Sequence, residues 1–194
     1  MTTAAPIHAA LPDGTPVLLR RIGPTDREGV LGAFARLSPE SRRARFWTRY
    51  ERLPESILQR FLHGDPARQD VWAALDPAQP ADLGYGGGSW WRDEEDPTVA
   101  EVSFTVADDA QHRGVGTLLL GVLWLSARER GITRLVANAL PENDAVRAWF
   151  TALGAARGHG LGHARYTLPL DEGKLPDSSA AERLRAVLAK LISA

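Results

Sequence analysis

Two glycines placed two residues apart are the most distinctive chemical feature of this sequence. Gly114 and Gly116 follow an expected strand, 98–106, and a short polar loop, and they open a strongly apolar stretch that ends near Arg130. Glycine lets the backbone adopt positive φ and lets a ligand approach the main chain without meeting a Cβ. The free N–H groups of a first helical turn favour an anion, and the helix dipole adds to this preference. The segment 106–120 therefore predicts a site for a phosphate-bearing ligand.

The spacing of these glycines excludes the commoner nucleotide loops. A Walker loop needs a lysine followed by serine or threonine at the helix start, but Gly116 is followed by Thr117. A dinucleotide fingerprint needs a third glycine where Leu119 stands, and it should follow the strand directly instead of after the seven residues 107–113. What remains is a pattern of the form Q-x-x-G-x-G at 111–116.

One domain must position this loop. The chain has 194 residues, of which 44% are hydrophobic and 24% charged, and a net charge of −1, which is typical of a single globular domain. We expect a tail or loose edge at 1–15, a folded domain at 16–170, and a linker followed by a C-terminal helix at 171–194.

The order of the expected elements indicates a mixed sheet. We expect strands at 16–22, 71–75, 81–92, 98–106, 133–139 and 163–168. We expect helices at 25–37, 38–47, 54–62, 114–130, 143–153 and 180–192. Capping signals mark two of the helix starts, with Thr25 and Glu28 forming a capping box and Ser38 preceding Pro39. Because hairpins stand beside crossover helices, we expect an α+β fold whose mixed, mostly antiparallel central sheet is flanked by helices.

Composition and missing patterns exclude several classes of site. The chain has no cysteine, which removes disulfides, thiolate zinc sites and an acyl-cysteine intermediate. The histidines show no ligand spacing, so no metal is expected. The net charge gives no reason to expect nucleic acid or membrane as partners, and no apolar run reaches the length of a membrane span. The start of the chain lacks the basic and apolar regions of a signal peptide, so a cytoplasmic protein is expected.

The pattern at 111–116, after a strand that ends in Val106, resembles the acetyl-CoA-binding motif of the GNAT acetyltransferase family. The family follows this motif with a strand and an asparagine-led helix that ends in glycine, and Asn143 to Gly154 occupies those places. The resemblance covers about 16–168. Within the family, the chain is most similar to the catalytic domains of bacterial Pat-type protein lysine acetyltransferases, and 37–42 and 100–109 carry that likeness.

The resemblance implies how acetyl-CoA is held. Backbone amides of the glycine loop bind the pyrophosphate, and the pantetheine pairs with the backbone at the end of the strand. Asn143 is also a preferred residue for capping a helix, and both roles are compatible. The residues expected to bind acetyl-CoA are Val106, Ala107, Gln111, His112, Arg113, Gly114, Val115, Gly116, Thr117, Asn143 and Phe150.

The same resemblance gives Glu101 a role in proton transfer. Glu101 shares the more polar face of its alternating strand with Ser103 and Thr105. A lysine ammonium, with a pKa of about 10.4, must lose a proton before its nitrogen attacks a thioester. A solvated glutamate would be the preferred interpretation without the resemblance. With it, we expect Glu101 to be the general base, acting directly or through water.

The implied activity is an acetyl-CoA-dependent N-acetyltransferase in which an amine attacks the thioester directly, with a protein lysine as the leading acceptor. Two alternatives stay open, a small amine acceptor such as an amino acid, polyamine or aminoglycoside, and a non-catalytic acyl-CoA-binding regulatory module. Phe150 bears on the second, because many members have a tyrosine there that protonates the leaving thiolate. The arginine-rich and aromatic stretch 42–52 is interpreted as an amphipathic helix bordering the acceptor groove. A homodimer is also considered.

Overall fold

The computed structural model describes residues 5–160 and 162–193 and contains one eight-stranded sheet. The strands are β1 (Ile7–Ala10), β2 (Pro16–Arg21), β3 (Gln69–Leu75), β4 (Gly86–Arg92), β5 (Val99–Val106), β6 (Arg134–Ala139), β7 (Ala156–Gly160) and β8 (His163–Pro169). They are arranged in the order β1-β2-β3-β4-β5-β6-β8-β7. Neighbouring strands of the described chain are antiparallel except β5 and β6, which are parallel. The mixed, mostly antiparallel sheet expected from the sequence is therefore confirmed.

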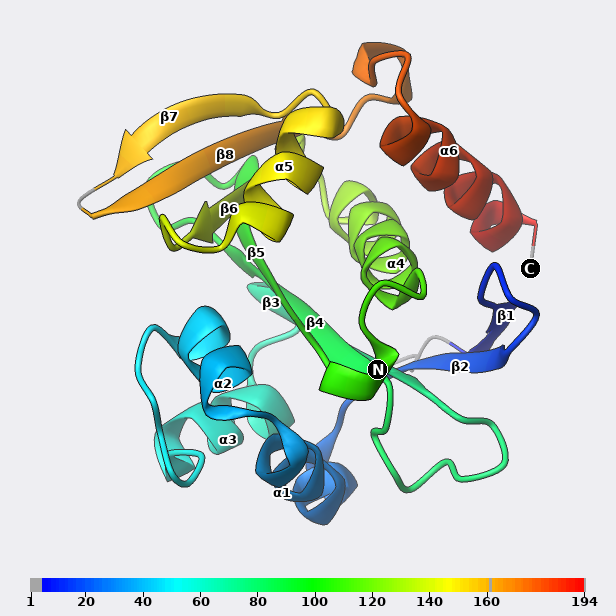
Figure 1. The fold of residues 1–194 in the computed structure, drawn as a ribbon, viewed down its shortest axis with the longest axis vertical. Helices are drawn as coiled ribbons and strands as arrows, with labels where there is room; N and C mark the ends of the chain where they lie inside the picture. Colours follow the sequence, from blue (N-terminus) through cyan, green and yellow to red (C-terminus); the bar gives the residue numbers. More distant parts are fainter. Residues whose placement is uncertain (1–4, 161, 194) are drawn as a thin grey trace.

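Helices cover both faces of this sheet. They are α1 (Arg27–Arg36), α2 (Pro39–Phe46), α3 (Glu55–His63), α4 (Val115–Glu129), α5 (Asp144–Ala152) and α6 (Ser179–Ile192), with short 3-10 turns η1 (Pro24–Asp26), η2 (Asp108–Ala110) and η3 (Glu172–Lys174). Figure 1 shows α1, α2 and α3 on one side of the sheet, and α4 with α6 on the other. No helix of the described chain is both long enough and apolar enough to cross a membrane.

The two faces of the sheet bury separate hydrophobic clusters. The larger lies between the sheet and α4, and it includes the fully buried Trp90 and Trp124. The indole N–H of Trp90 donates to the Ser126 hydroxyl at 2.9 Å, so this polar group is satisfied inside the core. The smaller cluster lies beneath α1 and α3 and includes Phe34 and Leu58. Helix α4 is apolar on nearly every side because the sheet covers one face and α6 covers another.

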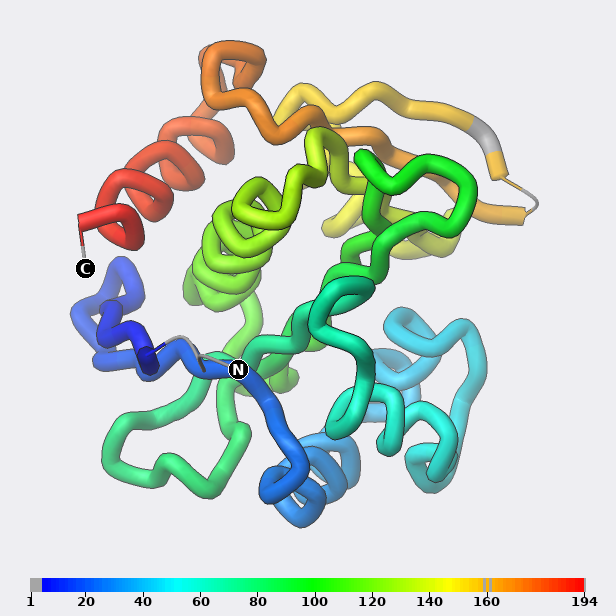
Figure 2. The backbone as a smooth tube through the Cα atoms, turned by 180° about the vertical axis from the view of Figure 1, so that it is seen from behind, coloured from blue at the N-terminus to red at the C-terminus, as the bar shows by residue number. Residues whose placement is uncertain are grey.

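Helix α6 packs closely on α4. A Cβ added at Gly121 of α4 would lie 2.5 Å from Val187 Cγ1 of α6, so glycine permits this close approach. The α6 residues Leu184 and Leu188 are fully buried in the same cluster. Figure 2 shows that the end of α6 lies near the β1–β2 hairpin. The expected C-terminal helix thus closes the α4 side of the core.

Truncating Leu188 should test this packing. We expect Leu188→Ala to lower the free energy of unfolding by about 2–5 kcal/mol, because it removes buried methyl groups and leaves a cavity. Ile192→Ala is the matched control, since Ile192 on the same helix is 64% exposed. Urea unfolding of both variants measures the difference. Equal midpoints for the two variants would contradict the structural role assigned to α6.

Three local features differ from the expectations. Part of 1–15 forms the edge strand β1, which pairs with β2 from Ile7 with Leu19 onward. Strand β7 was not expected, because its sequence A-R-G-H-G lacks an apolar alternation. In the structure it pairs antiparallel with β8. The first helix begins two residues later than expected. The backbone N–H of Gly23 donates to Asp26 at 2.8 Å, which replaces the expected capping box of Thr25 and Glu28.

Candidate functional site

Strands β5 and β6 separate partway along their length. Their parallel register runs from Val99 with Arg134 to Glu101 with Val136, although β5 continues to Val106. The other edge of β5 is occupied by β4 from Ala100 to Val106. Backbone polar groups that leave a sheet ladder need another partner. The gap beyond Glu101 therefore offers an edge of β5 to which an extended ligand could bind.

A buried acceptor lies on the β6 side of this gap. The Oδ1 atom of Asn138 is buried and has no hydrogen-bond partner among the described residues. Asn138 lies two residues beyond Val136, the last residue of β6 that is in register with β5. A buried acceptor without a donor is costly. A ligand that carries an amide N–H into the gap would supply the missing donor.

The glycine loop leads from β5 into α4. Gly114 has φ +101°, in the left-handed region, and is the N-cap of α4 with no side-chain hydrogen bond to the first turn. A Cβ at Gly114 would also lie 2.9 Å from Pro12 Cδ. A Cβ at Gly116 would approach nothing closer than Trp149 Cη2 at 3.7 Å. The positive φ and the close contact with Pro12 therefore favour glycine at position 114. The first-turn N–H groups of α4 have no side-chain cap.

Other residues of the loop have partners within the protein. The Gln111 side-chain amide lies 3.4 Å from the Val106 carbonyl oxygen and 3.3 Å from Asp108 Oδ1. Arg113 donates to Asp13 at 3.0 Å, in the turn between β1 and β2. His112 has φ +60°. The side chain of Val115 is buried in the core. Only its backbone N–H could therefore face a ligand.

Two residues expected near the cofactor lie on α5. Asn143 is the N-cap of this helix, and its side chain accepts from the Val146 N–H at 3.2 Å. Phe150 is fully buried, with its ring centroid 5.9 Å from that of Tyr166. The capping role of Asn143 is therefore confirmed. Contacts of Asn143 and Phe150 with a ligand stay predictions, and the Phe150 side chain belongs to the core in this structure.

Glu101 lies at the point where β5 and β6 begin to separate. Its side chain is exposed, and it stands opposite Trp91 of β4. Its charge acts on Arg45 of α2. Burial lowers the pKa of Arg45 to about 10, and the charge of Glu101 acts in the opposite direction. Arg45 is therefore charged at neutral pH. Helix α2 and β5 together bring an acidic and a basic side chain to one end of the gap.

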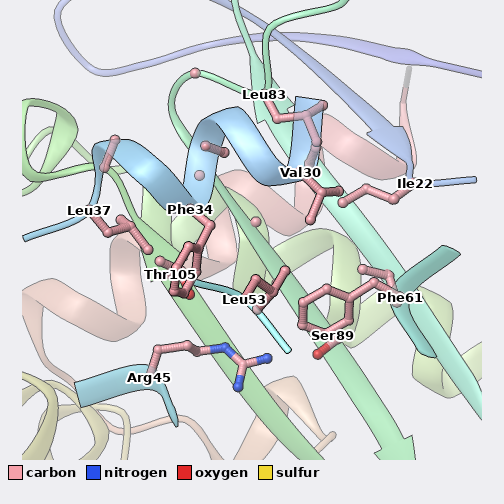
Figure 3. Close-up of a pocket in the computed structure, with 18 of the residues that line it drawn as sticks. Ile22, Val30, Phe34, Leu37, Arg45, Leu53, Phe61, Leu83, Ser89 and Thr105 are labelled. Carbon is pink, nitrogen blue, oxygen red and sulfur yellow. The ribbon is translucent and has the colours of Figure 1, made fainter. Parts of the chain in front are cut away.

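A cavity lies between the sheet and α1, α2 and α3, as Figure 3 shows. Its volume is about 90 Å³. Most of its wall is apolar, including Phe34, Leu53 and Phe61, while Arg45 and Thr105 contribute polar atoms. The bare backbone of 86–88 forms part of the wall on β4. This glycine run pairs in regular register with β3 and β5, where it leaves space for the cavity.

Asp108 joins the glycine loop to α2, a link that the sequence did not reveal. Its carboxylate accepts from the Ser38 N–H at 2.9 Å, the Ser38 hydroxyl at 3.0 Å and the Ser41 hydroxyl at 2.6 Å. Ser38 is also the N-cap of α2, as expected. Burial raises the pKa of Asp108, but the hydrogen bonds from Ser41 and Ser38 outweigh it and hold this pKa below its ordinary value of 3.8.

Removing the charge of Asp108 should loosen α2 from the loop. We expect Asp108→Asn to lower the free energy of unfolding by about 1 kcal/mol at pH 7. Because the folded-state pKa is lowered, this stabilisation is present above pH 3.8 and is lost as the pH falls through the lowered value. Asp109→Asn is the control, since the carboxylate of this neighbouring residue is exposed. Urea unfolding at pH 7 and pH 3 measures both, and equal stability of the two variants at pH 7 would contradict the link.

The described residues contain no group of three or more histidine, aspartate or glutamate side chains that could hold a metal ion.

A family model described as acetyltransferase (GNAT) domain matches residues 17–156. Acetyltransferase Pat of Mycolicibacterium smegmatis is 33% identical over 152 residues, which cover 77% of this chain and 44% of that protein. The chain therefore spans less than half the length of this relative.

Solved structures show the same architecture. The GNAT domain of S. lividans PAT superposes with a TM-score of 0.78 at 28% identity, covering 84% of this chain and 96% of that chain. The structure of yncA, a putative acetyltransferase from Salmonella typhimurium with its cofactor acetyl-CoA, has a TM-score of 0.61 at 21% identity, covering 83% of this chain and 98% of that chain. The second likeness concerns the fold alone.

Proposed function

Because this chain belongs to the GNAT acetyltransferase family, we propose that it transfers the acetyl group of acetyl-CoA to the side-chain amine of a protein lysine. The gap between β5 and β6, which opens beside the uncapped start of α4, is the observation that carries this proposal. An extended pantetheine and a pyrophosphate match these two features in shape and charge. The choice of lysine is supported by the resemblance of 37–42 and 100–109 to Pat-type protein lysine acetyltransferases.

The proposed donor site uses mainly the backbone. N–H groups of 111–117 bind the pyrophosphate, and they suit this task because they are fixed in place and cannot lose a proton. The pantetheine pairs with the backbone at the end of β5, at Val106 and Ala107, although the Ala107 N–H already donates to the Tyr85 carbonyl at 3.0 Å. Asn138 Oδ1 is a candidate acceptor for one of its amide N–H groups, since that atom has no partner in the described chain. Arg113 donates to the Asp13 carboxylate in this structure, so it must break this interaction, or divide its N–H donors between Asp13 and the ligand, if it is to contact a phosphate.

The proposed reaction is a direct attack. Glu101 takes the proton of the lysine ammonium, through water where the distance requires it. The neutral nitrogen then attacks the thioester carbon, the C–N bond forms, and the C–S bond breaks to release CoA. Phe150 cannot protonate the thiolate, so the thiolate leaves unassisted or takes a proton from water. A chain with no cysteine is consistent with this route.

The test compares three kinds of acceptor in one assay. CoA release from acetyl-CoA is measured with a cell-lysate proteome, with a panel of small amines and with buffer alone, and mass spectrometry locates the acetyl groups. Lysine acetylation in the proteome is the expected result. Turnover of small amines alone would overturn lysine as the acceptor. Acetyl-CoA binding without CoA release would overturn the enzyme in favour of a regulatory module. The cytoplasmic location and a homodimer remain part of the proposal and await separate measurement.

A further inference from the structure

Arg45 is an unusual residue for the wall of an apolar cavity. Its guanidinium packs over the rings of Phe46 and Phe61, at 5.0 and 5.8 Å from their centroids. No residue of the described chain forms a hydrogen bond or an ion pair with it, although it senses the charge of Glu101. Figure 3 shows the side chain reaching from α2 toward the part of the cavity lined by Ser89 and Phe61. A partly buried guanidinium without such a partner is expected to attract an anion.

The Ser89 hydroxyl, a second polar group of the cavity wall, is already engaged. The Ser89 hydroxyl accepts from the Trp91 indole N–H at 2.9 Å and lies 3.3 Å from the Ser103 hydroxyl. Among the described residues that line the cavity, Arg45 alone is charged, and its fork of N–H donors is available to a ligand. Such a fork matches the two oxygens of a carboxylate in geometry as well as in charge. A ligand for this cavity should combine a carboxylate with an apolar body.

The size of the cavity sets a limit on that ligand. One water molecule needs about 10–15 Å³ of such volume, and the cavity offers about 90 Å³. Several non-hydrogen atoms therefore fit, which suits a small molecule. Residues of α1, α2 and α3 contribute to its wall, and a space of this size suits a small molecule better than a folded protein surface.

We propose that this cavity is the acceptor pocket for a small apolar amine that carries a carboxylate, with Arg45 binding the carboxylate. An apolar α-amino acid has this chemistry. The inference rests on the proposed acetyl-CoA site and adds a second class of acceptor to protein lysine. Thr105 and Ala107 line the cavity and belong to the segment that is proposed to hold the pantetheine. An amine bound in the cavity thus lies on the side of β5 from which Glu101 also projects.

Acetyl transfer to this amine follows the same steps as transfer to lysine. The amine nitrogen loses a proton to Glu101 or to water and attacks the thioester carbon. The C–N bond of the amide forms as the C–S bond breaks, and the CoA thiolate leaves. Arg45 takes no part in these bonds. Its role is to hold the carboxylate so that the amine is directed toward the thioester.

The experiment uses a matched pair of amines. L-Leucine and 3-methylbutylamine differ only in the carboxylate, and their N-acetyl products are quantified by mass spectrometry with the full chain and acetyl-CoA. We expect kcat/KM for leucine to exceed that for 3-methylbutylamine by at least about tenfold, as a charged hydrogen-bonded pair would provide. Arg45→Met should bring the ratio close to one, and Arg45→Lys should keep part of it. Arg49→Met is the control, because Arg49 is exposed and does not line the cavity.

Two results would overturn the inference. One is an equal preference for the two amines in the wild-type chain, and the other is the absence of leucine turnover while proteins in a lysate are acetylated. The second result leaves the proposed function intact. If no acceptor releases CoA, the proposed function fails instead, and isothermal titration with leucine decides the pocket: binding that Arg45→Met abolishes supports it, and no binding overturns it. Thermal melting of each variant checks that it folds.

Discussion

Replacing Glu101 with glutamine is expected to lower kcat for acetyl transfer by about 100-fold while the affinity for acetyl-CoA stays nearly unchanged. A general base contributes about 10²–10⁴-fold to a rate, and glutamine keeps the size of the side chain but cannot accept the proton. Glu101 lies at the last position where β5 and β6 are in register, beside the proposed pantetheine gap but outside the glycine loop. Its loss should therefore change the chemical step and leave donor binding intact.

The measurement separates these two effects. Initial rates at saturating acetyl-CoA and acceptor give kcat, and isothermal titration gives the dissociation constant for acetyl-CoA. A further check is the pH profile, because raising the pH deprotonates the acceptor amine without help and should recover part of the rate of Glu101→Gln. Glu95→Gln is the control, since Glu95 is exposed in the turn before β5. Unchanged kcat in Glu101→Gln would remove the general base from the mechanism.

Elements with strong local signals could be predicted from the sequence. The apolar stretch after Gly114 forms α4, and Gly131 follows it with φ +77°, in the conformation that a helix-ending glycine adopts. Ser38 and Asn143 cap helices as their residue types suggest. Strand β7 could not be found in this way, because its five residues have little β preference of their own. Its pairing with β8 makes it a strand.

The candidate site also contains features that the sequence could predict and features that depend on the folded chain. The glycine loop is continuous in sequence, so its pattern could be recognised before its conformation was known. Arg45 and Asp108 could not be assigned, because their surroundings depend on α2 lying against β5 and η2. Asp108 and Ser38 are 70 positions apart, and their hydrogen bonds exist only in the folded chain. The interleaving of Arg45 with Phe46 was visible in the sequence, but periodicity alone indicates a solvated helix and does not show a cavity beneath it.

The conformation of Gly114 gives the second large prediction. We expect Gly114→Ala to raise the dissociation constant for acetyl-CoA by at least about tenfold, which corresponds to the loss of one or two hydrogen bonds to a charged group. An alanine is strained at φ +101°, and its Cβ would lie 2.9 Å from Pro12 Cδ. Relief of that contact must move the loop or the turn between β1 and β2. Either movement displaces the first-turn N–H groups of α4 from the positions proposed to bind the pyrophosphate.

Gly131→Ala separates strain from binding. Gly131 also has positive φ, at +77°, but a Cβ there would meet no atom within 4 Å, and it lies at the opposite end of α4. Both variants should lose stability through backbone strain, by about 1–3 kcal/mol. Only Gly114→Ala should lose affinity, as measured by isothermal titration at a temperature where both are folded. An equal loss of affinity in both variants would mean that strain in α4, and not the loop geometry, controls acetyl-CoA binding. No loss in either would remove the pyrophosphate from this loop.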